Sequence, residues 1–250
     1  MNRKYGCIKD EEDIRDLSYS AFLGSINPPE SFNNFDYMPP IYDQGEVGRC
    51  TGASTTAALT WRAKKSGYRP VTFSPDFAYY NGRALEGTTS TDSGAQIRDV
   101  IKGLVTKGVS TTDYWPDTEE TVTLEPNADA YKDALQHKVL QYMSVSQDIE
   151  VMKHVLATEG PIVGGITVCK SFESPDIIKS GYVPVPSTGE TILGRHAIVF
   201  VDYDENYVRF RNSWGITYGI QGYGYLPWEY VLDPYLAQDF WVILKISPYK

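Results

Sequence analysis

The spacing of apolar residues along the first 160 positions is mostly helical. Small and apolar residues recur every three to four positions after Cys50, and the run ends at Ser66 and Gly67, a common helix stop. Ser74 followed by Pro75 is typical of a helix start, because the hydroxyl caps the first turn and proline fits its first position. Helices are therefore predicted at residues 50–65, from residue 75, and at 95–105, 129–139 and 148–156.

From residue 160 onward, short runs of β-branched and aromatic residues alternate with turn residues. Asp204-Glu205-Asn206 and Asp233-Pro234 are two of these turns. Strands are predicted at residues 162–168, 181–185, 197–203, 207–211, 223–227 and 240–246. A helical half followed by an antiparallel sheet is an α+β arrangement with two lobes, and we expect a functional site in the cleft between them.

The pattern divides the chain into three parts. We predict an N-terminal extension or short pro-segment over residues 1–34, a mainly helical lobe over 35–140 and a mainly β lobe over 141–250, the two lobes forming one domain. The extension is polar but carries scattered apolar residues, which favour docking over full disorder. These residues are Ile14, Leu17, Phe22, Leu23 and Ile26. A wrapped arm, a pro-segment near the cleft and a flexible tail all stay open.

Composition and charge narrow the range of binding partners. The chain has 250 residues, of which 42% are hydrophobic and 22% charged, as is ordinary for a globular protein. A net charge of −9 argues against nucleic acid and against an anionic membrane surface. No apolar run reaches the roughly 18 residues of a transmembrane helix, and no signal-peptide core follows the N-terminus. Three sparse cysteines predict a reducing compartment such as the cytoplasm.

The stretch around Cys50 carries the first candidate chemistry. A thiol at a helix N-terminus lies near unpaired backbone N–H groups, whose partial positive charge favours the nucleophilic thiolate. Gln44 lies six positions earlier, where its side-chain amide can donate to the same site. We interpret Cys50 as a catalytic nucleophile and Gln44 as part of its oxyanion hole. The alternative is that Cys50 is a buried apolar filler in a helix of small residues.

A second candidate group lies far downstream. His196 enters one predicted strand, and Asn212 ends the next strand along the chain. Because a short turn joins these strands, we expect the two side chains to be neighbours. A histidine beside Cys50 can take its proton, an asparagine oxygen can fix the histidine tautomer, and Trp214 can shield their hydrogen bond from water. A structural histidine followed by a hairpin turn is the alternative.

The remaining histidines and cysteines show no pattern of their own. His137 and His154 lie in helix-like stretches, Cys169 ends a strand, and Cys7 is expected to be uncoupled from the chemistry. The spacing of cysteines and histidines lacks the paired arrangement of zinc sites, so we predict no metal.

Taken together, these motifs resemble those of the papain-like cysteine peptidases, family C1. The matching motifs are Gln44…Cys50 at a spacing of six, Gly194-Arg195-His196-Ala197, and Arg211-Asn212-Ser213-Trp214-Gly215. The resemblance covers residues 36–246 and implies the two-lobe papain fold, with a helical lobe and a β-sheet or barrel lobe. It further implies a protein or peptide substrate, no cofactor, and substrate binding by Ser93, Gly94 and Trp214.

This sequence departs from the family pattern at two positions. Thr51 follows Cys50 where the family usually has Trp, and Val47 stands where secreted members usually have a disulfide partner. The start of the chain looks like the bacterial and viral branch. The resemblance implies a cysteine-type endopeptidase that works through an acyl-enzyme at Cys50, His196, Asn212 and Gln44. The alternatives are an amidase, transpeptidase or deubiquitinase-like acyl transfer, and a catalytically silent binding protein. Self-inhibition by residues 1–34 is a further possibility.

Overall fold

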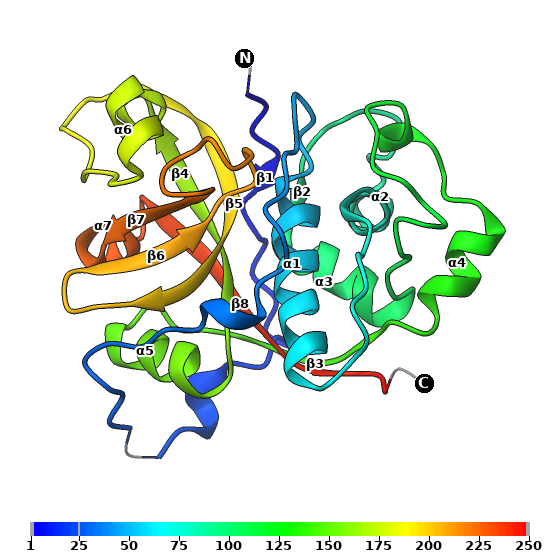
Figure 1. Cartoon of the computed structure of the whole chain (residues 1–250), viewed down its shortest axis with the longest axis horizontal. Coiled ribbons are helices and arrows are strands. Elements are labelled where there is room, and N and C mark those ends of the chain that lie inside the picture. Colours follow the sequence, from blue (N-terminus) through cyan, green and yellow to red (C-terminus); the bar gives the residue numbers. More distant parts are fainter. Residues whose placement is uncertain (1–2, 25, 249–250) are drawn as a thin grey trace.

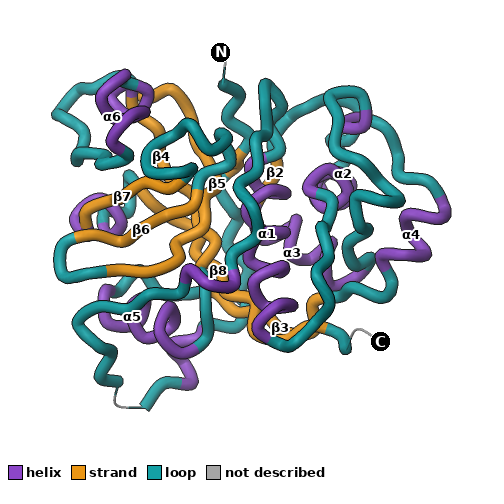
Figure 2. Tube along the Cα trace, in the orientation of Figure 1, coloured by secondary structure: helices purple, strands orange, loops and turns teal. Residues whose placement is uncertain are grey.

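The computed structural model describes residues 3–24 and 26–248, which form two halves that meet along one long helix. In Figure 1 the helices α1 to α4 lie on one side and the β-sheet on the other, with α1 at the junction. The tube coloured by secondary structure in Figure 2 shows the same division. No helix in the described part of the chain is long and apolar enough to cross a membrane.

The helical half contains four α-helices. They are α1 (Cys50–Lys65), α2 (Pro75–Glu86), α3 (Ile97–Thr106) and α4 (Ala128–Ala134). The α2 boundaries follow from its sequence, because the Ser74 side chain accepts a hydrogen bond from the Phe77 N–H and Gly87 ends the helix in the left-handed conformation. Short 3-10 helices are η1 (Tyr19–Phe22), η2 (Phe35–Tyr37), η3 (Thr121–Thr123) and η4 (Lys170–Glu173).

The other half is built on an antiparallel sheet of six described strands in the order β3-β8-β4-β5-β6-β7. The strands are β3 (Val139–Ser144), β4 (Ile162–Cys169), β5 (Ile192–Tyr203), β6 (Tyr207–Arg211), β7 (Tyr223–Pro227) and β8 (Ala237–Ile246). Helices α5 (Ile149–Thr158), α6 (Pro175–Ser180) and α7 (Trp228–Leu232) lie around this sheet (Figure 1). β4 is buried along its whole length, which is why its sequence lacks polar alternation.

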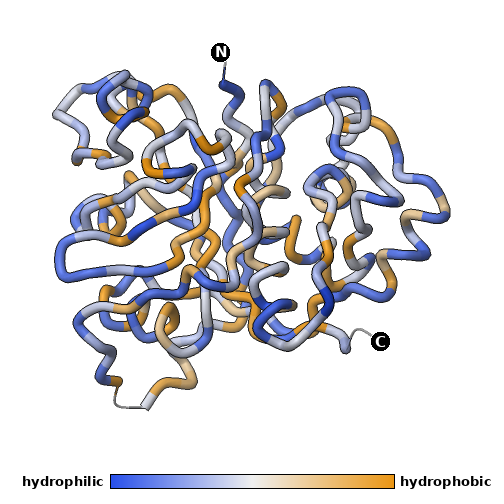
Figure 3. The backbone as a smooth tube through the Cα atoms, in the orientation of Figure 1, coloured by the Kyte–Doolittle hydropathy of each residue, from blue (hydrophilic) through white to orange (hydrophobic). Residues whose placement is uncertain are grey.

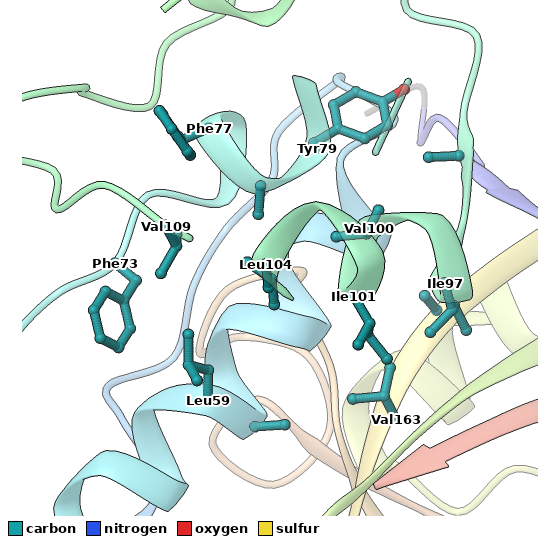
Figure 4. Close-up of a cluster of buried hydrophobic side chains, with 14 of the residues drawn as sticks. Leu59, Phe73, Phe77, Tyr79, Ile97, Val100, Ile101, Leu104, Val109 and Val163 are labelled. Carbon is teal, nitrogen blue, oxygen red and sulfur yellow. The ribbon is translucent and has the colours of Figure 1, made fainter. Parts of the chain in front are cut away.

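Two main clusters of buried apolar side chains stabilise the two halves. One joins α1, α2 and α3 to the sheet, and the close-up in Figure 4 shows Leu104 of α3 near Leu59 of α1 and Ile101 near Val163 of β4. The other lies between the sheet and α5 to α7. Hydrophobic segments accordingly run through the interior strands, and hydrophilic ones occupy the outer loops (Figure 3). Because the first cluster contains residues of both halves, the two lobes share a core.

The N-terminal chain runs between the halves before it crosses the sheet side (Figure 1). Its strand β1 (Cys7–Ile8) pairs parallel with β2 (Ala95–Gln96). Residues 18 and 32 form isolated bridges with Ser144 and Tyr203. The docked extension therefore touches both lobes.

Several boundary predictions were wrong for identifiable reasons. The helix predicted at 129–139 ends at Ala134, and β3 begins at Val139. The strand predicted at 181–185 is an irregular segment with one bridge, Tyr182 to Tyr225, after the unpredicted helix α6. α6 and α7 are short, so their sequences span too few turns to show helical periodicity.

Candidate active site

Cys50 is the first residue of α1 and is fully buried. The turn before it is anchored by Arg49, whose guanidinium lies 2.6 Å from a carboxylate oxygen of Asp76 in a fully buried ion pair. Gly52, one turn into the helix, allows α2 to pack closely, since a Cβ there would lie 2.3 Å from the Pro75 carbonyl oxygen. The position of the thiol is therefore set by contacts between α1 and α2. No sequence signal pointed to Asp76.

His196 and Asn212 are brought together by the pairing of β5 with β6. Val199 lies opposite Arg211 in this antiparallel pair, so Asn212, just beyond β6, comes close to the β5 segment that carries His196. His196 Nε2 donates to Asn212 Oδ1 at 2.9 Å, and the Trp214 ring centroid lies 4.9 Å from that of the imidazole. His196 Nδ1 is buried and makes no hydrogen bond with any described residue. That nitrogen is thus available to accept a proton.

The Cys50 thiol lies against the same strand. Backbone N–H groups of Ala197, the residue after His196, and of Gly6 lie near enough to the Cys50 sulfur to favour its thiolate. Burial nevertheless raises the pKa of Cys50 to about 11. Burial also lowers the pKa of His196 to about 4, against the opposing effect of its Asn212 bond. Burial therefore favours the neutral form of both groups while the strap is docked, whereas the sequence pattern predicts a thiolate.

Gln44 is fixed beside the catalytic candidates. Its backbone N–H donates to the Ser213 carbonyl at 2.8 Å, and the Ser213 hydroxyl donates to its Oε1 at 2.6 Å. Its Nε2 donates to the carbonyl oxygens of Val47 at 2.8 Å and of Lys4 at 3.3 Å. Ser213 was not predicted, although it belongs to the same motif as Asn212. The second amide hydrogen of Gln44 thus points at a backbone carbonyl of the N-terminal extension.

Residues 3–8, which we call the strap, cover this site. The strap passes Trp214, where the Arg3 guanidinium lies 5.2 Å from the ring centroid, and then Tyr5, whose ring is 6.4 Å from that of His196. Gly6 follows, with its N–H near the Cys50 sulfur and its carbonyl accepting a hydrogen bond from the Ala95 N–H at 2.9 Å. The strap is therefore the reason that the thiol and the imidazole are buried.

Glycine is required at position 6 of the strap. A Cβ on Gly6 would lie 1.7 Å from the carbonyl oxygen of Gly48, the residue two positions before Cys50. Cys7 then enters the interior, where a Cβ on Gly165 would lie 3.1 Å from its sulfur. Burial, with a smaller effect from Cys50, raises the pKa of Cys7. The pairing of β1 with β2 thus carries Cys7 next to Cys50, which its place in the extension did not indicate.

The predicted substrate-binding residues differ in what they contact. Gly94 has a left-handed φ of +87°, its N–H donates to the Tyr79 hydroxyl at 2.8 Å, and a Cβ there would lie 2.9 Å from the Gly6 carbonyl oxygen. Ser93 is exposed, and its hydroxyl donates to the carbonyl oxygens of Thr88 and Gly94 within its own loop. Trp214, together with Arg3 and others, lines an open pocket beyond the strap. Backbone at 94 and the ring at 214 thus meet the strap, and the Ser93 side chain does not.

Two other features of the structure bear on alternative chemistry. A larger pocket lies between α1 and residues 39–42, and it contains none of the four predicted catalytic residues. Among residues 3–24 and 26–248, no three His, Cys, Asp or Glu side chains are grouped as a metal site requires.

Comparison with known proteins assigns the family. The profile described as papain family cysteine protease matches residues 29–229. An uncharacterized peptidase C1-like protein of Acanthamoeba polyphaga mimivirus is 33% identical over 99% of this chain and 88% of the relative. Cathepsin K of Gallus gallus is 26% identical over 75% of this chain, and the match spans 54% of that relative.

Solved structures agree with that assignment. Xylellain, a cysteine protease from Xylella fastidiosa, is 34% identical with a TM-score of 0.89, covering 100% of this chain and 97% of the other. Procathepsin L2 of Tenebrio molitor is 19% identical, covers 99% of this chain and 79% of the other, and shares the fold with a TM-score of 0.75. The α+β fold is thus the papain-like two-lobe fold, and the chain belongs to the papain family of cysteine proteases.

Proposed function

We propose that this cysteine peptidase cleaves peptide bonds through an acyl-enzyme formed on Cys50, and that the described structure is its latent form. The observation that carries the first part is the His196–Asn212 hydrogen bond, on a strand whose next residue, Ala197, lies near Cys50 at the N-terminus of α1. These contacts leave His196 Nδ1 free to exchange a proton with the thiol.

The chemistry follows from these positions. With the strap displaced, the Cys50 thiol transfers its proton to His196 Nδ1, and the thiolate attacks the peptide carbonyl carbon. Gln44 Nε2 and the Cys50 backbone N–H hold the resulting oxyanion, and loss of one such donor typically costs about a hundredfold in rate. His196 then protonates the leaving amine as the carbon–nitrogen bond breaks and the thioester forms. Water, deprotonated by His196, hydrolyses the thioester and restores the thiol.

Asn212 and Trp214 act on the histidine and not on the substrate bond. The Asn212 oxygen holds Nε2–H, so that Nδ1 is the nitrogen directed to the thiol. Trp214 covers that hydrogen bond, and in this proposal the backbone around Gly94 binds the peptide once the strap has left. Ser93 contributes through its place in the loop, since its hydroxyl is bonded within it.

Latency is supported by what the strap does to the same groups. The Lys4 carbonyl accepts a hydrogen bond from the Gln44 amide that is proposed to hold the oxyanion, and the Gly6 backbone lies near the Cys50 sulfur. The solved structures of similar fold include a procathepsin, whose 19% identity speaks for fold alone. Displacing the strap exposes both groups, so the thiolate and the imidazolium regain the stabilisation of water and of each other.

The test is intact-mass labelling with a limiting thiol alkylator at mildly acidic pH, in wild type and in Cys50→Ala. Strap opening should give one fast adduct in the wild type that is lost in Cys50→Ala, since an activated thiolate reacts where ordinary thiols stay protonated. Labelling of Cys50 no faster than that of Cys169, even after residues 1–34 are removed from a protein that remains folded, would overturn the proposal. Product analysis with an added amine separates hydrolysis from transpeptidation. The reducing compartment is a prediction from the sequence. The assay buffer contains a reductant so that the cysteine thiols stay reduced.

A further inference from the structure

Each of the first three side chains of the strap meets a carboxylate that belongs to the body of the protein. Arg3 Nη1 lies 3.2 Å from Asp43 Oδ1. Lys4 Nζ lies 2.7 Å from Asp92 Oδ2. The Tyr5 hydroxyl donates to Glu173 Oε1. The surface under the strap is therefore acidic on both sides of Cys50.

Of these three carboxylates, Asp92 is the one that hydrogen bonds fix beside Cys50. Its Oδ2 accepts from the Gly48 N–H at 2.9 Å, and its Oδ1 accepts from the Tyr79 hydroxyl at 2.6 Å. Its side chain is 12% exposed, whereas that of Asp43 is 50% exposed. Both anchors lie outside the strap, so Asp92 keeps its position when the strap leaves.

The charge of Asp92 has no other partner. In the part of the chain that the structure describes, Lys4 is the only cation within ion-pair distance of it. Burial by itself raises the pKa of Asp92, but the hydrogen bonds from Lys4, Tyr79 and Gly48 outweigh burial, and the pKa is lowered. Departure of Lys4 thus leaves an ionised carboxylate near the nucleophile without its cation, which favours a substrate cation in the same place.

The contacts of Lys4 also indicate which residue of a substrate pairs with Asp92. Its own carbonyl oxygen accepts from Gln44 Nε2, while its ammonium binds Asp92. In a substrate, the residue whose carbonyl lies in the oxyanion hole is the one N-terminal to the scissile bond. One residue of the strap therefore occupies the oxyanion donor and Asp92 together.

We infer that Asp92 makes this peptidase select peptides with lysine on the N-terminal side of the cleaved bond. The inference rests on the proposed function, because it assigns the substrate class of that same site. Asp43 and Glu173 add a weaker preference for basic side chains nearby. Asp43 is exposed, so water and salt screen its charge, and Glu173 is half-buried and accepts a hydrogen bond from the Tyr5 hydroxyl. Lysine is favoured over arginine, because Asp92 has given one oxygen to Tyr79 and shares the other with Gly48, which leaves no open pair for a guanidinium fork.

The test measures how fast peptidyl acyloxymethyl ketones label Cys50, with probes that differ only in a final Lys, Arg or Gln. The Cys50 sulfur displaces the carboxylate of the probe, a carbon–sulfur bond forms as a carbon–oxygen bond breaks, and the thiol proton passes to His196. The full-length chain carries Gly6→Ala, because the added methyl clashes with Gly48 and disfavours the docked strap. Intact mass gives the rate constant, and the ratio of two probes cancels differences in the open fraction.

We expect the Lys probe to react about tenfold or more faster than the Gln probe, as a charge-assisted hydrogen bond implies. Adding Asp92→Asn should bring this ratio to within about threefold, because the residual preference comes from Asp43 and Glu173. Asp113→Asn, an exposed carboxylate in the turn before Trp115, is the matched control and should keep the full ratio.

The outcomes separate the two proposals. A Lys-to-Gln ratio below about two in the parent, or a full ratio that survives Asp92→Asn, overturns the inference while labelling of Cys50 still supports the proposed function. If no probe labels Cys50 in the Gly6→Ala chain, the proposed function fails and the lysine preference fails with it.

Discussion

The strap and the residues that follow it, 9–24, are attached to the protein by different kinds of contact. The strap is held by close backbone approach, with Gly6 packed on Gly48 and its carbonyl bonded to Ala95. Residues 9–24 are held by ion pairs such as Asp16 with Arg98 at 3.1 Å, while the side chain of Ile14 is fully exposed. The strap thus adds a close backbone match to its contacts with carboxylates, whereas residues 9–24 rely on ion pairs and on side chains such as Tyr19 and Leu23 packed against the sheet cluster.

The largest effect should come from breaking the shape match. Gly6→Ala places a methyl 1.7 Å from the Gly48 carbonyl oxygen, and overpacking of this kind typically costs about 1–3 kcal/mol. We expect alkylation of Cys50 in the full-length chain to become roughly tenfold to a hundredfold faster, as the open fraction rises.

Gly24→Ala is the control for that substitution. No atom lies within 4 Å of a Cβ at position 24, so this change should leave the alkylation rate at its wild-type value. An unchanged rate in Gly6→Ala would mean that the strap is not what limits access to Cys50.

A smaller effect is expected from the charged part, through Asp10. Its backbone N–H donates to Asp239 at 3.2 Å, and burial, followed by the Asp239 charge, raises the pKa of Asp10 to about 7. The nearby charges are Arg98 of α3, and Arg195 of β5, which pairs with Asp239 at 2.8 Å. Because this pKa lies above the ordinary 3.8, Asp10 contributes most to stability below about pH 4, and the contribution is lost as pH rises to 7.

Asp10→Asn should remove that pH dependence. Between pH 4 and pH 7 the wild type should lose up to about 1.4 kcal/mol of unfolding free energy per pH unit relative to the variant. Thermal unfolding of both proteins across this range makes the comparison, and asparagine keeps the oxygen that accepts from Trp241. Parallel stability profiles would show that Asp10 titrates normally in the folded chain.

The smallest effect is expected at Asp16. Asp16→Asn breaks its ion pair with Arg98, and a partly exposed pair is worth at most about 1 kcal/mol. We expect alkylation of Cys50 to accelerate less than about fivefold, and less still in high salt, which already screens the pair. An acceleration as large as that of Gly6→Ala would erase the distinction between shape and charge.

The sequence predicted the elements that carry a long periodic signal. α1 and β6 have the predicted bounds, because their patterns are complete within one segment. The docking of the extension was expected from its apolar residues. Leu23 and Ile26 do pack against the sheet cluster, but Ile14, Leu17 and Phe22 are exposed, and ion pairs add to the attachment. Those partners lie far away in the chain, so local spacing could not reveal them.

The same limit applies to the candidate site. Cys50, His196, Asn212 and Gln44 could be named because each belongs to a recognisable motif. The Arg49–Asp76 pair and the contact of Cys7 with the site depend on packing between separate elements. The sequence also did not reveal that burial favours the neutral thiol and imidazole. That burial depends on the strap, and the sequence of the strap carries no motif.

The hydrogen bonds between Gln44 and Ser213 have a consequence for how the site opens. With the Gly215 N–H on the Tyr42 carbonyl at 3.1 Å and a core shared by both lobes, they tie the two sides together directly beside Cys50. Opening therefore proceeds by peeling a short segment and not by a hinge between domains. Since the effect of a denaturant scales with the surface that a transition exposes, release of the strap should respond only weakly to urea. Low concentrations of urea should unmask few active sites, and steep unmasking should begin only where the lobes themselves unfold.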